Sequence, residues 1–245
     1  MRRFTIGPER IDGTRVAFDR EESHHLMRVL RLRPGDLVIA ADGQGHDYTV
    51  RIDALGATAS GTVVASRTPA VESPLAVSLL QGIAKGDKME TIVRAATELG
   101  VRRIVPVITE RTVVRLDPAR WRERARRWQR VAREASKQCG RPVVPEVDAP
   151  APLAAVLAEA ATAELRLCFW EEATEPLSSA LRRVTAAPSA VQILVGPEGG
   201  LAPTEAAAAH EQGFTPVRLG PRVLRTETAG PAAVAILQSR FGDLA

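Results

Sequence analysis

Cysteine and histidine are scarce in this chain of 245 residues, which limits the metal chemistry it can carry. The two cysteines, Cys139 and Cys168, lie far apart and outside any CxxC spacing. We therefore expect a protein of a reducing, cytoplasmic compartment without a zinc site. No ligand spacing connects the four histidines, which are His24, His25, His46 and His210. The sequence thus predicts no bound metal.

Long apolar segments are also missing. A membrane-spanning helix needs roughly 18 or more uncharged residues, and the uncharged run over residues 54–66, like every other run in this chain, is shorter. No apolar segment follows the two arginines at the N-terminus, so we expect neither a secretory signal nor a membrane partner. With 45% hydrophobic and 25% charged residues, the chain has the composition of a soluble globular protein of one or two domains.

Lysine is rare as well, with three lysines against thirty arginines, and the positive charge is concentrated in one segment. Residues 111–141 carry eleven basic and three acidic side chains, a net charge of +8, whereas the whole chain carries +4. Such a patch attracts polyanions, because each neutralised phosphate releases counterions. An arginine-rich helix with a solvated face has the same composition, so the patch alone leaves both interpretations open.

The first 70 residues have the pattern of a small β-barrel. Short strands bounded by turn residues are predicted at residues 3–6, 14–18, 36–43, 46–52 and 60–66. One helix, over residues 19–32, interrupts them, and Asp19 with Glu22 has the spacing of a capping box. On this helix we expect Leu26, Val29 and Leu30 to face inward and Arg28, Arg31 and Arg33 to face outward. Residues 68–76, with two prolines and no strand pattern, are the predicted linker.

From residue 74 onward, strands alternate with helices. Apolar strands are predicted at residues 75–82, 102–109, 165–170 and 190–195, an extended piece at 142–147, and helices at 85–100, 151–161 and 176–184. Strands that are apolar on both faces indicate a parallel sheet covered by helices. The fold class is therefore α/β, with an N-terminal β domain over 1–70 and an α/β domain over 74–245.

A long helix begins at Asp117-Pro118, with an aspartate cap and a proline in its first turn. Its apolar face consists of Trp121, Ala125, Trp128, Val131 and Ala135. Arginines occupy the remaining positions, so we expect the tryptophans in the core and the arginines in solvent.

Two loops rich in glycine and proline end buried strands near the C-terminus. The first is GPEGG at residues 196–200, and the second is LGPRVLRTETAGP at residues 219–231. In open α/β sheets, ligands bind beyond the carboxyl ends of the strands, where such loops lead into helices. In the second loop, Thr226 or Thr228 can cap the following helix, and Pro231 is tolerable only in its first turn.

The glycine spacing of the first loop matches neither GxGxxG nor GxxxxGK[ST], which disfavours a phosphate cradle. Glu198 adds a negative charge that a phosphate would oppose. A ligand with hydroxyl groups, an amine or a sulfonium fits the two loops better. A tight strand-to-helix turn explains the first loop taken alone, but two polar loops at one sheet edge favour a binding site.

GPEGG followed by LGPRVLRTETA resembles the C-terminal signature of the ribosomal small subunit methyltransferase E family, of the SPOUT class of S-adenosylmethionine-dependent RNA methyltransferases. Similar blocks occur at residues 23–36, 85–101 and 133–145, in order over nearly the whole chain. The resemblance implies an RNA-binding PUA-like barrel, a parallel sheet with a C-terminal trefoil knot, and a homodimer. It also implies methylation of N3 of one uridine in 16S ribosomal RNA, within the small ribosomal subunit.

The resemblance further implies that three loops hold the S-adenosyl-L-methionine cofactor. The residues it assigns to them are Phe169 and Glu171; Gly196, Pro197, Glu198, Gly199 and Gly200; and Leu219, Gly220, Leu224, Thr226 and Thr228. This chain departs from the family pattern at Leu201-Ala202, where a capping hydroxyl is usual, and at Gly230-Pro231. Pro203 and Glu205 are expected to offset part of the first loss, which is worth on the order of 1 kcal/mol.

Methylation of uridine N3 requires removal of its proton and stabilisation of the resulting ring anion. Candidate proton acceptors are Glu134 and Glu227, and candidate donors to the anion are Arg225, Arg141 and Lys137. We favour Arg225 with Glu227, because both lie in the LRTET segment. The residues expected to contact RNA are Arg28, Arg31, Arg33, Lys85, Lys88, Arg130, Arg133, Lys137 and Arg141.

Two alternatives remain open from the sequence. The first is an enzyme of the same class that methylates a ribose 2′-hydroxyl or another base of ribosomal or transfer RNA. The second is a non-catalytic, RNA-binding ribosome-assembly protein that keeps the fold. Of the other polar residues, His24 and His25 are expected to pack or to touch the RNA backbone.

Overall fold

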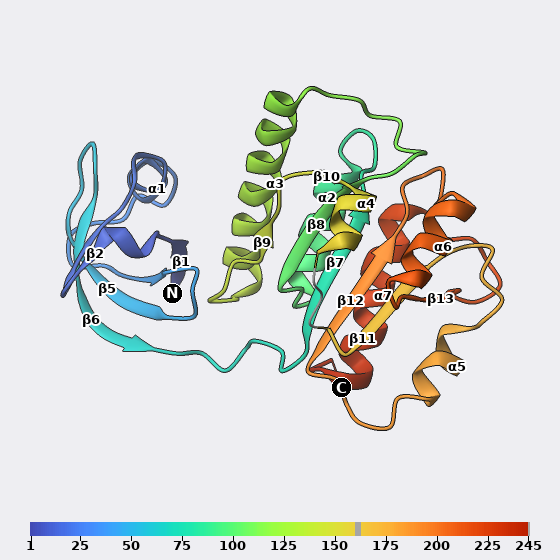
Figure 1. Cartoon of the computed structure of the whole chain (residues 1–245). Helices are drawn as coiled ribbons and strands as arrows, with labels where there is room; N and C mark the ends of the chain where they lie inside the picture. The colour runs from blue at the N-terminus through green and yellow to red at the C-terminus, as the bar shows by residue number, and fades with distance from the viewer. Residues whose placement is uncertain (160–162, 245) are drawn as a thin grey trace. The chain divides into compact units, whose positions relative to one another are not determined.

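A computed structural model of the chain describes residues 1–159 and 163–244 and contains two compact units (Figure 1). The N-terminal unit consists of Met1–Glu72 together with Arg133–Val144. The C-terminal unit consists of Ser73–Ala132 and Pro145–Ala245. The N-terminal unit is therefore built from two separate segments of the chain, and no single boundary in the sequence divides the two units.

The N-terminal unit contains a six-stranded sheet with the strand order β1-β4-β5-β6-β3-β2. Its strands are β1 (Arg2–Thr5), β2 (Ile11–Asp12), β3 (Arg15–Ala17), β4 (Leu37–Ala41), β5 (Asp47–Ala54) and β6 (Ser60–Arg67), and a short turn of helix, η1 (Pro8–Arg10), precedes β2. β1 pairs with β4 in parallel, and the other pairs are antiparallel. The five predicted strands are present, and Phe4, Phe18 and Leu26 lie in the core that the sheet covers.

The predicted helix at residues 19–32 divides into α1 (Arg20–His24) and a π-helical turn, η2 (His25–Val29). The Asp19 carboxylate accepts a hydrogen bond of 2.8 Å from the Glu22 N–H, as the capping pattern predicted. The inward orientation predicted for Val29 is wrong, because this side chain is 62% exposed. The i→i+5 hydrogen bond from Leu30 N–H to His25 O widens the turn and rotates Val29 off the apolar face that contains Leu26.

The C-terminal unit is built on a seven-stranded sheet with the order β10-β8-β7-β12-β11-β13, and with β9 paired to β8. The strands are β7 (Ala76–Gly82), β8 (Arg103–Ile108), β9 (Glu146–Val147), β10 (Ala151–Pro152), β11 (Leu165–Phe169), β12 (Ala190–Val195) and β13 (Thr215–Val217). Every described pairing is parallel, as predicted. The carboxyl ends of the adjacent strands β12, β11 and β13 therefore lie at one edge of the sheet.

Helices connect these strands (Figure 1), and α2 packs against α7. Their bounds are α2 (Lys88–Glu98), α3 (Pro118–Cys139), α4 (Leu153–Ala158), α5 (Leu177–Arg182), α6 (Pro203–Glu211) and α7 (Thr226–Phe241). The helix predicted over 151–161 is shorter at its start, where β10 forms, and its predicted residues 160 and 161 lie outside the described residues. No helix in the described parts of the chain is long and apolar enough to cross a membrane.

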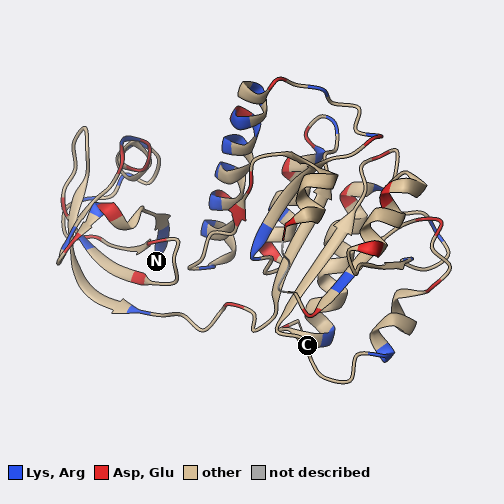
Figure 2. Ribbon diagram, viewed as in Figure 1, with Lys and Arg blue, Asp and Glu red and all other residues tan. Residues whose placement is uncertain are grey.

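The long helix α3 begins where the sequence predicted. The Asp117 carboxylate accepts hydrogen bonds from the Ala119 and Arg120 N–H groups at 2.9 and 3.0 Å. Trp121 and Trp128 are buried, and Lys and Arg positions recur along the helix (Figure 2). The tryptophans are therefore core residues rather than platforms for stacked bases.

Candidate functional site

A pocket of about 320 Å³ opens at the sheet edge where β11, β12 and β13 end. Three loops form its walls, each following one of these strands. Of the residues predicted to hold a cofactor or to act in catalysis, the pocket is lined by Phe169, Glu171, Gly196, Pro197, Glu198, Gly200, Leu219, Gly220, Leu224, Arg225, Thr226 and Glu227. Gly199 and Thr228 lie outside its lining. The structure thus gathers the three predicted loops around one cavity, and the role of each residue stays a prediction.

Glycines in the first loop allow backbone segments to approach closely. A Cβ on Gly196 would lie 2.9 Å from the Gly200 carbonyl carbon and 3.0 Å from the Leu201 nitrogen. Gly200 adopts φ +69°, a left-handed conformation that favours glycine. Gly199 lies outside the pocket lining, and its carbonyl accepts a hydrogen bond of 2.9 Å from the Arg111 guanidinium.

The Thr226 hydroxyl ties the start of α7 to the first loop. It donates a hydrogen bond of 2.7 Å to the Gly196 carbonyl and accepts one of 2.9 Å from the Gln81 amide. Gln81 and Thr226 are both buried. The prediction that Thr226 or Thr228 caps α7 is wrong: Arg225 is the N-cap, without a side-chain cap, and the Thr226 hydroxyl is used across the sheet instead.

Pro231 does not lie in the first turn of α7, the only place where the sequence analysis expected a proline to be tolerated. Since α7 begins at Thr226, Pro231 lies beyond the first turn, inside the helix. Its ring therefore removes one intrahelical hydrogen bond, whose acceptor would be the Glu227 carbonyl. Gly230 precedes it, and a Cβ there would lie 2.9 Å from the Gln81 side-chain oxygen. These two unusual residues thus lie in the second turn of α7, where Gly230 packs closely against β7.

The helix after the first loop begins without a capping hydroxyl, and Glu205 in its first turn instead binds the backbone N–H of the N-cap residue, Ala202. The Glu205 carboxylate accepts hydrogen bonds from the Ala202 N–H at 3.0 Å and from the Glu110 N–H at 2.8 Å. Pro203 occupies the first helical position of α6. This arrangement agrees with the compensation expected from Pro203 and Glu205 for the Leu201-Ala202 departure.

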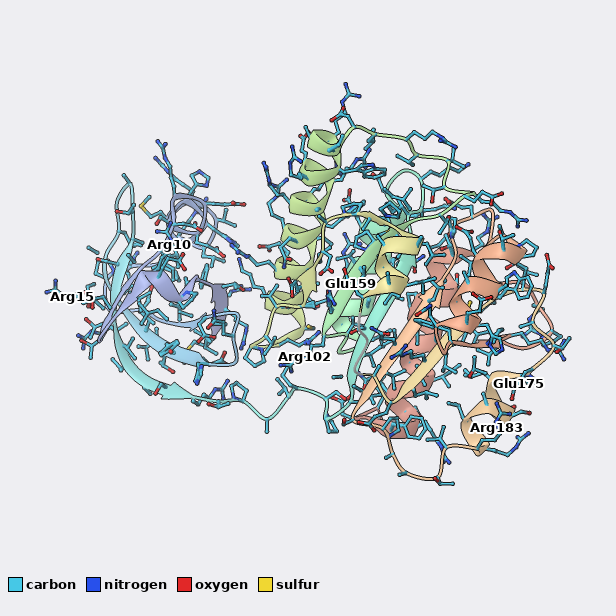
Figure 3. All side chains as sticks on the ribbon, in the orientation of Figure 1. Arg10, Arg15, Arg102, Glu159, Glu175 and Arg183 are labelled. Atoms are coloured by element: carbon cyan, nitrogen blue, oxygen red, sulfur yellow. The ribbon has the colours of Figure 1, made fainter. Side chains whose placement is uncertain are left out.

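The third loop follows β11, and backbone hydrogen bonds join it to the end of β13, just before the second loop. Trp170 N–H donates to Val217 O at 3.0 Å, and Arg218 N–H donates to Glu175 O at 2.9 Å. An ion pair between Glu175 and Arg183 holds the far end of this loop next to α5 (Figure 3). Phe169 and Glu171 are thereby fixed in the pocket wall.

Glu227 and Arg225 both line the pocket, at the first turn of α7. The hydrogen bond from its own backbone N–H, together with the Lys88 ammonium, lowers the pKa of Glu227 below its ordinary value. Glu227 is therefore ionised at neutral pH. Arg225 is exposed, so its guanidinium is accessible to a ligand.

The other candidates for the proton transfer lie elsewhere. Glu134 is on α3, 66% exposed, and is not part of the pocket lining. Lys137 pairs with Glu22 at 2.9 Å, and Arg141 pairs with Glu72 at 2.7 Å. Among the five residues considered from the sequence, only Glu227 and Arg225 are brought to the pocket.

The basic residues predicted to contact RNA fall into two groups. Lys137 and Arg141 are engaged in the ion pairs described above, and the Lys88 ammonium lies 3.3 Å from both Glu198 and Glu227. The remaining six are solvent-exposed: Arg28, Arg31, Arg33, Lys85, Arg130 and Arg133. Among the predicted residues, only these six can bind a polyanion without first breaking one of the ion pairs described above.

Sequence reasoning missed several residues of the pocket. Arg218 and Arg222 line it, and both follow β13, the strand that leads to it. Gln81 was also missed, although a polar residue at the end of the apolar strand β7 is a signal for such a role. Its amide contacts the Gly196 carbonyl at 3.5 Å and the Gly82 carbonyl at 3.0 Å.

The two cysteines differ in reactivity because of their surroundings. Burial in β11, with smaller contributions from Glu171 and Glu205, raises the pKa of the Cys168 thiol to about 12. Cys139 is exposed. At pH 8 a chromogenic disulfide reagent is therefore expected to modify one thiol in the native protein and two after unfolding in guanidinium. Rapid reaction of both thiols in the native state would contradict the burial of Cys168.

Family models and relatives agree with the resemblance found in the sequence. An RNA methyltransferase domain model matches residues 71–238, and an RNA methyltransferase PUA domain model matches residues 18–59. The ribosomal RNA small subunit methyltransferase E of a Synechocystis strain is 34% identical over 236 residues, which cover 95% of this chain and 76% of that protein. The protein of the same name from Mycobacterium tuberculosis is 34% identical over 238 residues, covering 94% and 89%.

Solved structures agree as well. The ribosomal RNA small subunit methyltransferase E of Neisseria gonorrhoeae, bound to S-adenosyl methionine, superposes with a TM-score of 0.89 at 35% identity and covers all of both chains. A putative methyltransferase from Legionella pneumophila, in complex with the same cofactor, superposes with a TM-score of 0.90 at 32% identity, covering 99% of this chain and 98% of that one. The resemblance inferred from the sequence is confirmed: this chain is a member of the ribosomal RNA small subunit methyltransferase E family.

Proposed function

We propose that the chain transfers the methyl group of S-adenosylmethionine to N3 of a uridine in the 16S ribosomal RNA of the small ribosomal subunit. The observation that carries this proposal is the pocket that three loops form together at one edge of a parallel sheet. Support also comes from the solved relatives that hold S-adenosylmethionine.

Groups of both charges line the pocket: the carboxylates Glu171, Glu198 and Glu227, and the cations Lys88, Arg218, Arg222 and Arg225. Lys88 pairs with Glu198 and Glu227, whereas Glu171 offers negative charge to a sulfonium or an amine. The glycine backbone of residues 196–200 permits close approach of a flat or sugar-like group. We assign the cofactor's contacts to the lining residues of the three loops, and among the predicted residues outside the lining we retain Gly199 and Thr228 as supports of the loop shape. Bound here, S-adenosylmethionine supplies an electrophilic methyl group.

The chain's own residues have two tasks at the uridine. N3 carries a proton at neutral pH, and we assign its acceptance to the ionised Glu227. Loss of that proton leaves an anion shared by O2 and O4 of the ring. We assign stabilisation of this anion to the Arg225 guanidinium, which lies two residues before Glu227 on the same loop. N3 is on the Watson–Crick edge, so a paired uridine must first be extruded.

Two measurements test the proposal. Calorimetry with S-adenosylmethionine should give saturable binding by the purified chain. Mass spectrometry of 16S ribosomal RNA fragments, after incubation of small subunits with isotope-labelled cofactor, should place the label on a uracil ring. A label on ribose or on another base would replace our substrate with one of the alternatives. No cofactor binding at all would leave only a non-catalytic, RNA-binding role.

We also propose the domain roles that the resemblance implies. Residues 1–70 would form a PUA-like barrel that contacts RNA, and residues 74–245 would form the SPOUT domain with its C-terminal trefoil knot. The bond from Thr226 to the Gly196 carbonyl supports a close passage of α7 behind the first loop. The apolar last helix, with Ile236 exposed, supports the proposal of a homodimer.

An arginine stripe on α3 is the surface we propose for RNA phosphates. Arg122, Arg126 and Arg130 are exposed and follow one another at a spacing of four residues, which places them on one helix face. By contrast, Arg127 is engaged with Glu90 at 2.6 Å.

Replacing Arg126 and Arg130 together by alanine is expected to weaken RNA binding at every salt concentration. It should also lower the slope of log affinity against log salt by about 2, one for each lost phosphate contact. Filter binding or fluorescence anisotropy with 16S ribosomal RNA fragments measures both quantities. Arg182→Ala, an exposed arginine on α5, is the control. An unchanged salt slope in the double variant would remove the stripe from the RNA interface.

A further inference from the structure

One ammonium group bridges two of the loops that form the pocket. Lys88 Nζ lies 3.3 Å from Glu198 Oε1 and 3.3 Å from Glu227 Oε2. Glu198 belongs to the first loop, after β12, and Glu227 to the first turn of α7. Lys88 itself is the first residue of α2, so it joins three parts of the fold that are distant in the sequence.

The turn before α2 strengthens this bridge. The Lys85 N–H donates a hydrogen bond of 3.1 Å to the same oxygen, Oε1, of Glu198. Gly86 adopts φ +63°, which lets the chain fold back so that the Lys85 amide and the Lys88 ammonium face one carboxylate. Residues 85–88 thus hold Glu198 by a backbone group and by a charge.

The charges explain why a cation is needed at this position. Glu198 and Glu227 each touch Lys88, so their carboxylates lie no further apart than twice that contact distance. Their side chains, like that of Lys88, are about a quarter exposed, and screening by water is correspondingly incomplete. Without a cation between them, two ionised carboxylates at this spacing repel each other.

We propose that Lys88 is a positioning residue of the methyltransferase site: it holds the Glu198 and Glu227 carboxylates together so that the first loop and the start of α7 keep the shape that binds S-adenosylmethionine. This inference rests on the function proposed above. It replaces the prediction that Lys88 contacts RNA, since binding a phosphate would require the ammonium to leave both carboxylates.

The test compares Lys88→Met with Lys88→Arg. Methionine keeps the length and helix propensity of lysine but removes the charge, whereas arginine keeps the charge. Binding of S-adenosylmethionine is measured by calorimetry without RNA, which separates this role from any contact with RNA. We expect Lys88→Met to weaken binding by at least about tenfold, because it leaves two neighbouring carboxylates without their shared cation, and Lys88→Arg to recover most of it.

A matched control and a second background keep the result interpretable. Arg94→Met removes an exposed cation from the same helix and should leave cofactor affinity unchanged. In a chain that already carries Glu198→Gln and Glu227→Gln, adding Lys88→Met should have little further effect, because the carboxylates it serves are neutral. This comparison measures cofactor affinity with and without Lys88→Met in the background that carries both glutamines. It therefore remains decisive even if Lys88→Met alone lowers stability.

The outcomes separate the inference from the proposed function. If the unaltered chain binds no S-adenosylmethionine, the proposed function fails. If the unaltered chain binds and Lys88→Met binds equally well, the positioning role is wrong and the proposed function stands. Failure of Lys88→Arg to restore binding, or an equal loss in the neutral-carboxylate background, would likewise overturn the inference.

Discussion

Arg225→Ala is expected to lower the rate of methyl transfer by about 10²–10³-fold while leaving the affinity for S-adenosylmethionine within about threefold of its original value. Removing one donor to a developing anion costs roughly this much in other enzymes. Arg225 is exposed on the pocket wall at the start of α7, and its side chain caps nothing there, so little stability should be lost. Single-turnover transfer to small ribosomal subunits and calorimetry with the cofactor alone measure the two quantities.

Arg240→Ala is the control for this experiment. It removes an arginine from the last turn of the same helix, far from the pocket lining, and should leave both quantities unchanged. Unchanged turnover in Arg225→Ala would remove Arg225 from the site. A parallel loss of cofactor affinity would make it a binding residue instead.

The second large effect is expected from Gly82→Ala. Gly82 ends β7, and a Cβ there would lie 2.5 Å from Pro197 Cδ and 2.7 Å from the Gly196 carbonyl carbon. These atoms belong to backbone or to a rigid ring, so the first loop must move as a whole to accommodate a methyl group. We expect cofactor affinity to fall at least about tenfold, and the free energy of unfolding to fall by about 1–3 kcal/mol, as overpacking usually costs.

Calorimetry and thermal unfolding test this expectation, with Gly56→Ala as the matched control. A Cβ on Gly56 would meet only the Thr58 carbonyl oxygen, at an ordinary contact distance of 3.7 Å. Neither glycine has a positive φ, so the two variants differ in the space available rather than in backbone strain. Full cofactor affinity in Gly82→Ala would mean that the first loop tolerates displacement and that its close packing on β7 is not required for binding.

Features set by neighbouring residues could be predicted from the sequence. Asp117 caps α3, and the strands predicted from apolar runs pair in parallel. The location of the pocket could also be predicted, because parallel strands place their carboxyl ends at one edge of the sheet and the polar loops begin there. In each case the pattern and the physical cause lie within a few residues.

Features set by distant contacts could not be predicted. The Thr226 hydroxyl has the local spacing of a helix cap, but pairing of β7 with β12 places Gln81 and the Gly196 carbonyl within its reach. Lys88 has the appearance of an exposed basic residue, and only the fold brings Glu198 and Glu227 to it. Val29 follows the helical period of Leu26, and the π-helical turn that displaces it has no signature in the local pattern.

The return of residues 133–144 to the N-terminal unit has a consequence for biosynthesis. Burial raises the pKa of Glu22, and the Lys137 ammonium that compensates for it comes from the end of α3. Glu72 likewise receives Arg141, and Gly43 forms a bridge with Val143. A nascent chain that has emerged only to residue 72 therefore lacks these partners. These contacts of the N-terminal unit can form only after translation has released more than half of the polypeptide from the exit tunnel.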